Sequence, residues 1–283
     1  MSTPPAEDLF VLIGHPVARS ASPAMHQAAF AALGSRARYL ALDVSDFAAG
    51  WEALRRLEVR GGNVTIPWKE RAAAALDDPS PDSVLCRSAN TFWRTPEGRL
   101  AGTQTDGEGF LRALWEAFGL APEGLRVAVL GAGGGARAVL HALARGGAAA
   151  LHLWNRSTAR AEMLARELVR AGFGGELVLL EGPRAAVARP DLLVNATSLG
   201  LRPHDPAPAT AAAFPGIPFA MDLVYGSEPT PFLREFTRGE TRVADGRLML
   251  LHQAACSLEL WLDKPAPLAE MRKALARVLG EAV

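Results

Sequence analysis

The segment RVAVLGAGGGARAV, residues 126–139, has the most specific chemical pattern in the chain. Its short apolar run before the glycines is typical of a buried parallel strand. Gly131, Gly133 and Ala136 match the dinucleotide-binding fingerprint, with alanine in the third position. The first glycine would permit a tight turn, the second a close approach to a pyrophosphate, and the small third residue close packing of helix on strand. The segment therefore predicts a helix N-terminus that binds phosphates, with an ordinary Gly/Ala turn as the alternative.

A second segment, about twenty residues further on, indicates which dinucleotide would bind. A strand-like run, residues 151–154, is followed by Asn155, Arg156 and Ser157, and Arg160 comes one helical turn later. Sites for NAD usually have Asp or Glu here to hold the ribose 2′-hydroxyl. A carboxylate would repel a 2′-phosphate, whereas a guanidinium can bind it, and the hydroxyl of Ser157 or Thr158 can cap the next helix. We therefore expect NADP, although an arginine-rich helix start is the alternative.

Lys69 follows a polar strand end and is a candidate proton donor. Asn63 and Thr65 alternate with apolar residues, which places both on one face of a strand. Pro67 is expected to end this strand and to start a helix with Lys69 in its first turn, where the helix dipole disfavours a cation. Only three of the 30 basic residues are lysines, so a lysine at this point suggests that a titratable amine is required. A solvated surface lysine is the alternative.

Two further groups of polar residues lie near predicted helix starts. Ser20 and Ser22 precede Pro23, and Ser22 has the sequence position of an N-cap. Two hydroxyls beside a helix N-terminus suit a carboxylate ligand. Asp106 follows a run of small polar residues and opens a helix that we expect at residues 108–118, where it could also be an N-cap.

Composition excludes several classes of function. The formal net charge is zero and no run of like charges occurs, so nucleic acid and anionic membranes are poor partners. No apolar segment approaches the ~20 residues of a membrane span. The two cysteines indicate neither a disulfide framework nor a metal site, and we expect a cytoplasmic protein without a bound metal. The 283 residues suffice for two domains of modest size.

The order of elements predicts an α/β protein. Residues 9–13, 39–44 and 61–66 are strand-like and alternate with helical stretches, and a second series begins at Arg126. In a doubly wound sheet, residues 195–200, including Thr197 and Ser198, lie at the carboxyl edge where ligands bind. A strand at 219–224 ends beside Tyr225, and the longest predicted helix begins at Gly246 and contains Gln253. We predict two α/β domains with a cleft between them, the second a Rossmann-type doubly wound parallel sheet.

These segments, in this order, resemble the shikimate dehydrogenase family over about residues 10–261. The resemblance rests on many short motifs together and is highly specific. They are Ser-x-Ser-Pro at 20–23, Asn-Val-Thr-x-Pro-x-Lys at 63–69, Asn-Thr at 90–91, Thr-Asp at 105–106, the glycine loop at 131–138, Asn-Arg at 155–156, and the segments 195–200, 222–225 and 249–253.

The resemblance implies a domain arrangement and a reaction. Residues 1–105 and 243–283 would form a substrate-binding and catalytic domain, with an NADP-binding Rossmann domain, residues 106–242, inserted in it. The reaction would be the reversible reduction of 3-dehydroshikimate to shikimate by NADPH in aromatic amino acid (chorismate) biosynthesis. The protein would be a monomer or a homodimer.

The resemblance also implies roles for individual residues. Lys69 and Asp106 would be the catalytic pair, with Lys69 as the proton donor and Asp106 orienting its amine. The substrate carboxylate would contact Ser20, Ser22 and Tyr225, and the ring hydroxyls would contact Asn63, Thr65, Asn90 and Gln253. The predicted cofactor-binding residues are Gly131, Ala132, Gly133, Gly134, Gly135, Ala136, Asn155, Arg156, Ser157, Arg160, Thr197, Ser198 and Gly246.

Two departures from the family pattern leave substrate preference open. Gln104 stands where the family usually has asparagine, and Arg87 stands in a segment that is usually small and apolar. One alternative is therefore a relative that acts on quinate or prefers another cofactor. A second is a nucleotide-sensing homologue without turnover, which the presence of both Lys69 and Asp106 disfavours.

Overall fold

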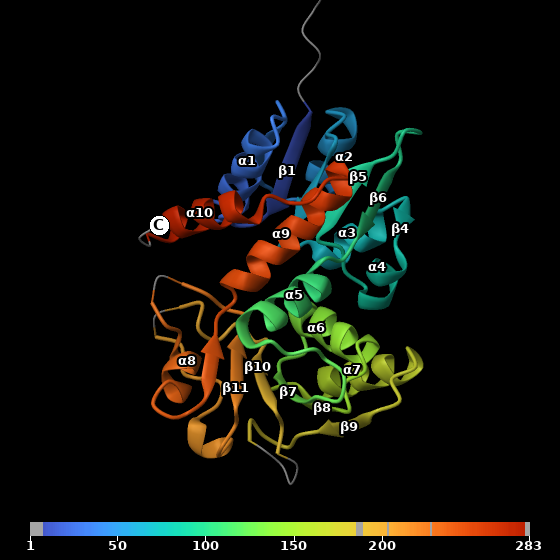
Figure 1. Cartoon of the computed structure of the whole chain (residues 1–283). Helices are drawn as coiled ribbons and strands as arrows, with labels where there is room; N and C mark the ends of the chain where they lie inside the picture. The colour runs from blue at the N-terminus through green and yellow to red at the C-terminus, as the bar shows by residue number, and fades with distance from the viewer. Residues whose placement is uncertain (1–7, 185–188, 203, 227, 281–283) are drawn as a thin grey trace, which may run out of the picture. The chain divides into compact units, whose positions relative to one another are not determined.

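The computed structural model describes residues 8–184, 189–202, 204–226 and 228–280 (Figure 1). The chain divides into two compact units, the first made of Met1–Thr105 and Gln253–Val283 and the second of Asp106–His252. Each unit contains a six-stranded sheet. The mixed α/β class and the two-sheet architecture expected from the sequence are confirmed.

The second crossing between the units lies further along the chain than expected. The family resemblance implies a crossing at residue 243, whereas residues 243–252 belong to the second unit. The reason is that β12 (Arg242–Ala244), a strand that the sequence analysis missed, pairs with β11 (Phe219–Asp222). Met249 then packs into the core of the same unit.

The sheet of the first unit has the strand order β2-β1-β3-β5-β6-β4. The first three of these strands are parallel, and β5 runs antiparallel to both β3 and β6. The carboxyl ends of β1 and β3 and the start of β5 therefore meet at one edge of the sheet. The strands are β1 (Leu9–Gly14), β2 (Arg38–Asp43), β3 (Gly61–Val64), β4 (Asp78–Pro79), β5 (Thr91–Arg94) and β6 (Leu100–Thr103).

Helices cover both faces of this sheet. On one face, α2 contributes Phe47, Trp51 and Leu54 to a cluster that includes Val11 and Phe92 of the strands. On the other face, the ring of Phe10 lies 5.3 Å from that of Phe30 on α1 and 4.7 Å from that of Trp261 on α9. The helices are α1 (Ser22–Ala32), α2 (Phe47–Arg56), α3 (Lys69–Ala75), α4 (Pro81–Cys86), α10 (Leu268–Leu279) and the end of α9 (Arg247–Leu262).

The second unit has a fully parallel sheet with the order β12-β11-β10-β7-β8-β9. Its strands are β7 (Arg126–Leu130), β8 (Ala150–Trp154), β9 (Glu176–Leu179), β10 (Leu192–Asn195), β11 and β12. Its other elements are α5 (Asp106–Phe118), α6 (Gly134–Arg145), α7 (Thr158–Arg170), the 3-10 helix η1 (Ala211–Ala213), α8 (Pro231–Phe236) and the start of α9.

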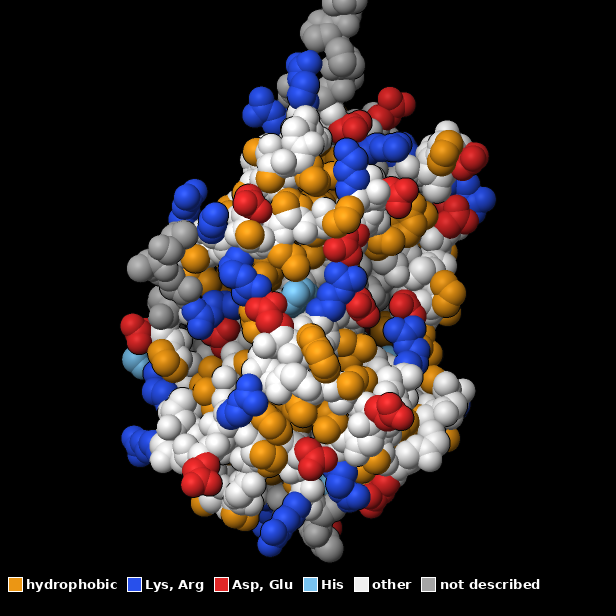
Figure 2. Space-filling view, viewed as in Figure 1, with side chains coloured by type: hydrophobic (Ala, Val, Ile, Leu, Met, Phe, Trp, Pro, Cys, Tyr) orange, Lys and Arg blue, Asp and Glu red, His pale blue; other side chains and the backbone are white. Residues whose placement is uncertain are grey.

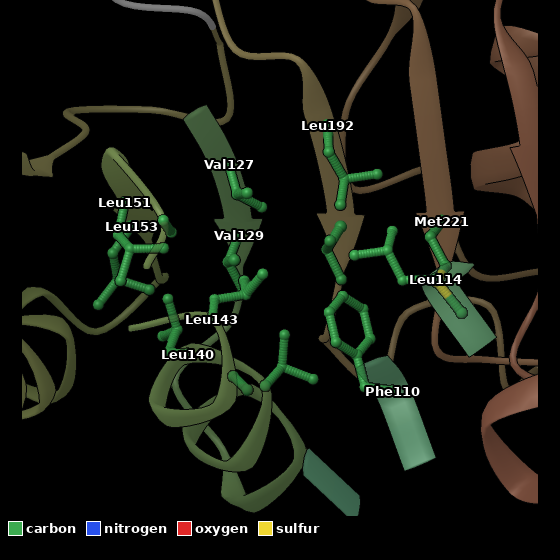
Figure 3. Close-up of a cluster of buried hydrophobic side chains, with 14 of the residues drawn as sticks. Phe110, Leu114, Val127, Val129, Leu140, Leu143, Leu151, Leu153, Leu192 and Met221 are labelled. Atoms are coloured by element: carbon green, nitrogen blue, oxygen red, sulfur yellow. The ribbon is translucent and has the colours of Figure 1, made fainter. Parts of the chain in front are cut away.

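The alternation of side chains along the central strands explains why this sheet has helices on both faces. Val127 and Val129 of β7 pack in one cluster with α5, α6 and α7, whereas Ala128 and Leu130 pack in another with α8. In Figure 3, Val127, Val129, Leu192 and Met221 from neighbouring strands lie opposite Phe110 and Leu114 of α5 and Leu140 and Leu143 of α6. Continuous apolar runs are typical of such two-sided burial.

The segment 77–82 contains β4 and the start of α4. The Ser80 hydroxyl caps this helix by accepting from the Ser83 backbone N–H at 3.1 Å. No helix in the described ranges is long and apolar enough to cross a membrane. On the face drawn in Figure 2, basic and acidic side chains are interspersed.

Candidate functional site

The glycine loop of the second unit has the geometry of an anion-binding turn. β7 ends at Leu130, and Gly131 follows with φ +120°, in a position where a Cβ would lie 2.6 Å from the Ala196 carbonyl oxygen. Gly133 is the N-cap of α6, and no described side chain caps this helix. A Cβ built on Gly133 has no heavy atom within 4 Å, so open space faces the backbone there. Space beside uncapped N–H groups fits a pyrophosphate.

The remaining loop residues complete this turn. Gly134 and Gly135 are the first residues of α6, Ala132 lies in the turn itself, and Ala136 is fully buried against the sheet. The small third residue of the fingerprint therefore sits at the contact of helix and strand, as the sequence predicted.

Asn155 connects the end of β8 to the glycine loop. Its side-chain Oδ1 accepts a hydrogen bond from the Ala132 backbone N–H at 3.1 Å, and its Nδ2 donates to the Ser157 carbonyl oxygen at 3.0 Å. Arg156 and Arg160 are exposed. Ser157 is the N-cap of α7, but its side chain makes no capping hydrogen bond, so the predicted hydroxyl cap is wrong. The hydroxyl is exposed.

Polar residues also lie at the ends of β10 and β11. Asn195 Nδ2 donates to Asp222 Oδ1 at 2.8 Å, and the Thr197 hydroxyl donates to Asn195 Oδ1 at 2.7 Å. The Thr230 hydroxyl donates to the other Asp222 oxygen at 2.5 Å. Burial raises the pKa of Asp222 to about 6, against the lowering effect of these donors. The hydrogen bond between Asn195 and Asp222 joins the ends of β10 and β11. Ser198, three residues after β10, is exposed.

Gly246 and Tyr225 follow β12 and β11. The Gly246 backbone N–H donates to the Val224 carbonyl at 3.2 Å, and a Cβ on Gly246 would lie 2.1 Å from the Leu223 carbonyl oxygen. Glycine is therefore required here by a close backbone contact. Tyr225 is partly buried, which raises the pKa of its hydroxyl.

In the first unit, two of the predicted site residues, Thr65 and Lys69, come after the end of β3. Thr65 directly follows β3, and its methyl group fills the space that a Cβ on Gly14 would occupy. Lys69 is the first residue of α3, as predicted, and its carbonyl oxygen accepts from the Ala89 backbone N–H at 2.9 Å. That bond places the backbone of Lys69 beside Ala89, the residue before Asn90.

Ser20 and Ser22 lie at the start of α1. Ser22 is the first residue of the helix and Ala21 is its N-cap, without a side-chain capping bond, so the predicted capping role of Ser22 is wrong. Instead the Ser22 backbone N–H donates to the Ser20 hydroxyl at 3.3 Å. The Ser20 hydroxyl is thus held beside the backbone of Ser22 at a helix N-terminus, an arrangement that suits an anion.

Asn63, Asn90 and Gln253 belong to one buried hydrogen-bonded network. Asn90 Nδ2 lies 3.2 Å from Gln253 Oε1, and Asn63 Nδ2 donates to the Asn90 carbonyl at 3.0 Å. The structure adds residues to this network that sequence reasoning missed, namely Tyr39, Thr91, Thr105 and Ser257. Thr91 and Thr105 belong to motifs that carry the resemblance, and Ser257 follows Gln253 by four residues on one helix and so lies on the same face.

The residues that mark departures from the family pattern lie in the first unit. Gln104 is buried, and its side-chain Nε2 donates to the Ser88 hydroxyl at 2.9 Å. Arg87 is exposed at the end of α4 with φ +46°. The Gln104 bond therefore positions the segment just before Asn90.

The predicted site residues fall into both units. Ser20, Ser22, Asn63, Thr65, Lys69, Asn90 and Gln253 belong to the first unit. Tyr225 and all predicted cofactor-binding residues belong to the second unit, as does Asp106, the first residue of α5. A Cβ on the next residue, Gly107, would lie 3.0 Å from the Ala138 carbonyl of α6, so α5 starts in close contact with α6. The assigned pair of Lys69 and Asp106 and the carboxylate contact of Tyr225 remain predictions.

The parallel sheet and its glycine loop define the second unit as a Rossmann-type dinucleotide-binding fold, joined to an α/β unit with a polar site at its sheet edge. Three family models match the chain. They are the shikimate dehydrogenase substrate binding domain at residues 12–92, shikimate / quinate 5-dehydrogenase at 117–200 and the shikimate 5′-dehydrogenase C-terminal domain at 246–276.

Individual relatives agree with these models. The chain is 43% identical to the shikimate dehydrogenase (NADP(+)) of Moorella thermoacetica over 96% of this chain and 94% of the relative. The crystal structure of shikimate 5-dehydrogenase from Thermus thermophilus with NADP(H) and shikimate is 40% identical, covers 96% of this chain and 100% of its own, and has a TM-score of 0.84. The chain therefore belongs to the shikimate dehydrogenase family.

A second solved structure represents the main alternative activity. Quinate dehydrogenase from Corynebacterium glutamicum in complex with NAD is 28% identical, covers 96% of this chain and 99% of its own, and has a TM-score of 0.87.

Proposed function

We propose that the protein catalyses the reversible NADPH-dependent reduction of 3-dehydroshikimate to shikimate, a step of aromatic amino acid biosynthesis. The observation that carries this proposal is the polar sheet edge of the first unit. There the Lys69 carbonyl accepts from the backbone N–H of Ala89, the residue before Asn90, and Ser20 and Ser22 lie at a helix N-terminus. Together these groups suit a ligand with a carboxylate, several hydroxyls and a carbonyl that must be protonated.

The cofactor-binding groups are complementary to NADP. Uncapped N–H groups at the start of α6 would bind the pyrophosphate, and Asn155 would hold the loop in shape. The exposed guanidinium groups of Arg156 and Arg160 would bind the 2′-phosphate in place of the carboxylate that NAD sites use. When bound, the reduced nicotinamide supplies the hydride.

The chain's own residues would supply the proton and the orientation. Negative charge grows on the carbonyl oxygen of the substrate during reduction, so a proton donor at that oxygen stabilises the transition state. Lys69 would donate this proton, and Asp106 would orient the amine. Ser20, Ser22 and Tyr225 would fix the carboxylate at the opposite end of the ring and so set which carbon faces the cofactor.

Steady-state turnover with shikimate or quinate, each paired with NADP⁺ or NAD⁺, tests this proposal. We expect efficient reduction of the cofactor with shikimate and NADP⁺. Higher kcat/KM with quinate or NAD⁺ would instead support the alternative that the quinate dehydrogenase structure represents. Binding of NADPH without turnover of either acid would support the nucleotide-sensing alternative.

A further inference from the structure

Asn63 has no hydrogen left for a ligand in this structure. Its Nδ2 lies 3.0 Å from the Asn90 carbonyl oxygen, 3.2 Å from Thr91 Oγ1 and 2.9 Å from Ser257 Oγ. A carboxamide nitrogen carries two hydrogens, so three acceptors saturate it. The side chain is only 5% exposed. The family resemblance assigns Asn63 to a substrate hydroxyl, and this environment points to a different role.

The orientation of the Asn63 amide is fixed from both sides. A backbone carbonyl only accepts, so the atom that faces the Asn90 carbonyl must be Nδ2, and Oδ1 must face the opposite side. There the Tyr39 hydroxyl donates to Oδ1 at 2.7 Å. Tyr39 is 3% exposed and its ring stacks on His26 at 4.5 Å, which holds the hydroxyl in place.

Ser257, on α9, connects the Asn63 amide to Gln253 of the same helix. Its hydroxyl is fully buried, lies 2.7 Å from Thr91 Oγ1 and donates to the Gln253 carbonyl at 3.0 Å. Gln253 is partly exposed, and its Oε1 accepts from Asn90 Nδ2. The hydrogen-bonded path therefore starts at a buried tyrosine and reaches solvent at Gln253.

We propose that Tyr39, Asn63 and Ser257 are positioning residues, which hold Asn90 and Gln253 in the arrangement that receives a ring hydroxyl of the substrate. Asn63 is then a support for the site and does not touch the substrate. The proposal rests on the proposed function for the identity of the ligand. The network itself is independent of that function.

Two variants each remove one hydroxyl from the path, namely Tyr39→Phe and Ser257→Ala. We expect each to raise the KM for shikimate about fivefold to tenfold, the change that a lost hydrogen bond corresponds to, with kcat and the KM for NADP⁺ within twofold. Ser83→Ala is the matched control. The Ser83 hydroxyl is fully buried in the first unit without a partner among the described residues, and its loss should leave both constants unchanged.

A structural measurement distinguishes failure of the network from failure of the proposed function. Side-chain amide NMR signals of Asn63 in the wild-type chain should exchange with solvent far more slowly than those of an unstructured peptide. Tyr39→Phe or Ser257→Ala should lower this protection and shift the Asn90 signals. Fast exchange in the wild type overturns the proposal, whether or not shikimate is turned over. So does a wild-type KM in both variants, or an equal rise in KM in Ser83→Ala.

Discussion

Asn155, at the end of β8, accepts a hydrogen bond from the backbone N–H of Ala132 in the glycine loop at 3.1 Å. One side chain thus joins the two parts of the nucleotide-binding edge, the turn after β7 and the start of α7. This bond joins an uncharged side chain to a backbone atom of the loop. It should therefore hold the shape of the loop and should not contact the 2′-phosphate that distinguishes NADP from NAD.

Asn155→Ala should therefore weaken the binding of NADP⁺ and of NAD⁺ to the same extent. Loss of the bond to Ala132 frees the loop, and we expect the KM values for NADP⁺ and NAD⁺ to rise together by about fivefold, as for one lost hydrogen bond. Steady-state kinetics with each cofactor measures this. A rise confined to NADP⁺ would show that Asn155 acts on the 2′-phosphate instead.

Arg156→Ala should weaken the binding of NADP⁺ and leave the binding of NAD⁺ unchanged. Hydrogen bonds to charged groups are worth about 1.5–3 kcal/mol, so the KM for NADP⁺ should rise roughly 10- to 100-fold while that for NAD⁺ stays the same. Arg166→Ala removes an exposed arginine of α7, the helix that follows Arg156, and serves as the control. Equal losses for both cofactors in Arg156→Ala would contradict the assignment of Arg156.

Lys69→Ala should abolish most turnover and leave the fold intact. Positioned general acid–base groups contribute typically about 10²–10⁴ in rate, so kcat should fall by that factor. Lys264→Ala, which removes an exposed lysine of the same unit, should keep wild-type kcat, and circular dichroism should be unchanged in both variants. A near-wild-type kcat in Lys69→Ala would exclude Lys69 as the proton donor.

The ionisation of Asp222 should lower the free energy of unfolding of the protein as the pH rises. Burial raises the pKa of this carboxyl to about 6 in the folded state, above its unfolded value, so the folded state binds the proton more tightly. Its contribution to stability is therefore present at low pH and is lost as the pH rises from about 4 to about 6, by about 3 kcal/mol in total.

Asp222→Asn removes this titration. Asparagine keeps an acceptor for Asn195 and the Val224 N–H, and the Thr230 hydroxyl can accept from its amide. The free energy of unfolding of the variant, relative to the wild type, should thus increase by about 2 kcal/mol between pH 4 and pH 7, measured by denaturant unfolding. Glu162→Gln, at an exposed position on α7, is the control. A difference that does not change with pH would show that the pKa is not raised.

The sequence alone determined the nucleotide-binding unit well, because its signals are local. Gly131 needs a positive φ, Ala136 must be small at the contact of helix and strand, and the apolar runs on either side set β7 and α6. Local rules also placed Lys69 at the start of α3, since Pro67 precedes it. They failed for Ser22 and Ser157, where a capping residue type stands at a helix start but its hydroxyl makes no capping bond.

Only the tertiary structure showed how the polar residues of the first unit are used. Tyr39 and Asn63 are 24 residues apart, and Asn63 and Ser257 are 194 residues apart, so no spacing pattern relates them. β12 is similarly a strand of three residues that exists because β11 offers it a partner. Short-range preferences select turns and helix starts, whereas buried side-chain hydrogen bonds depend on which distant segments the fold brings together.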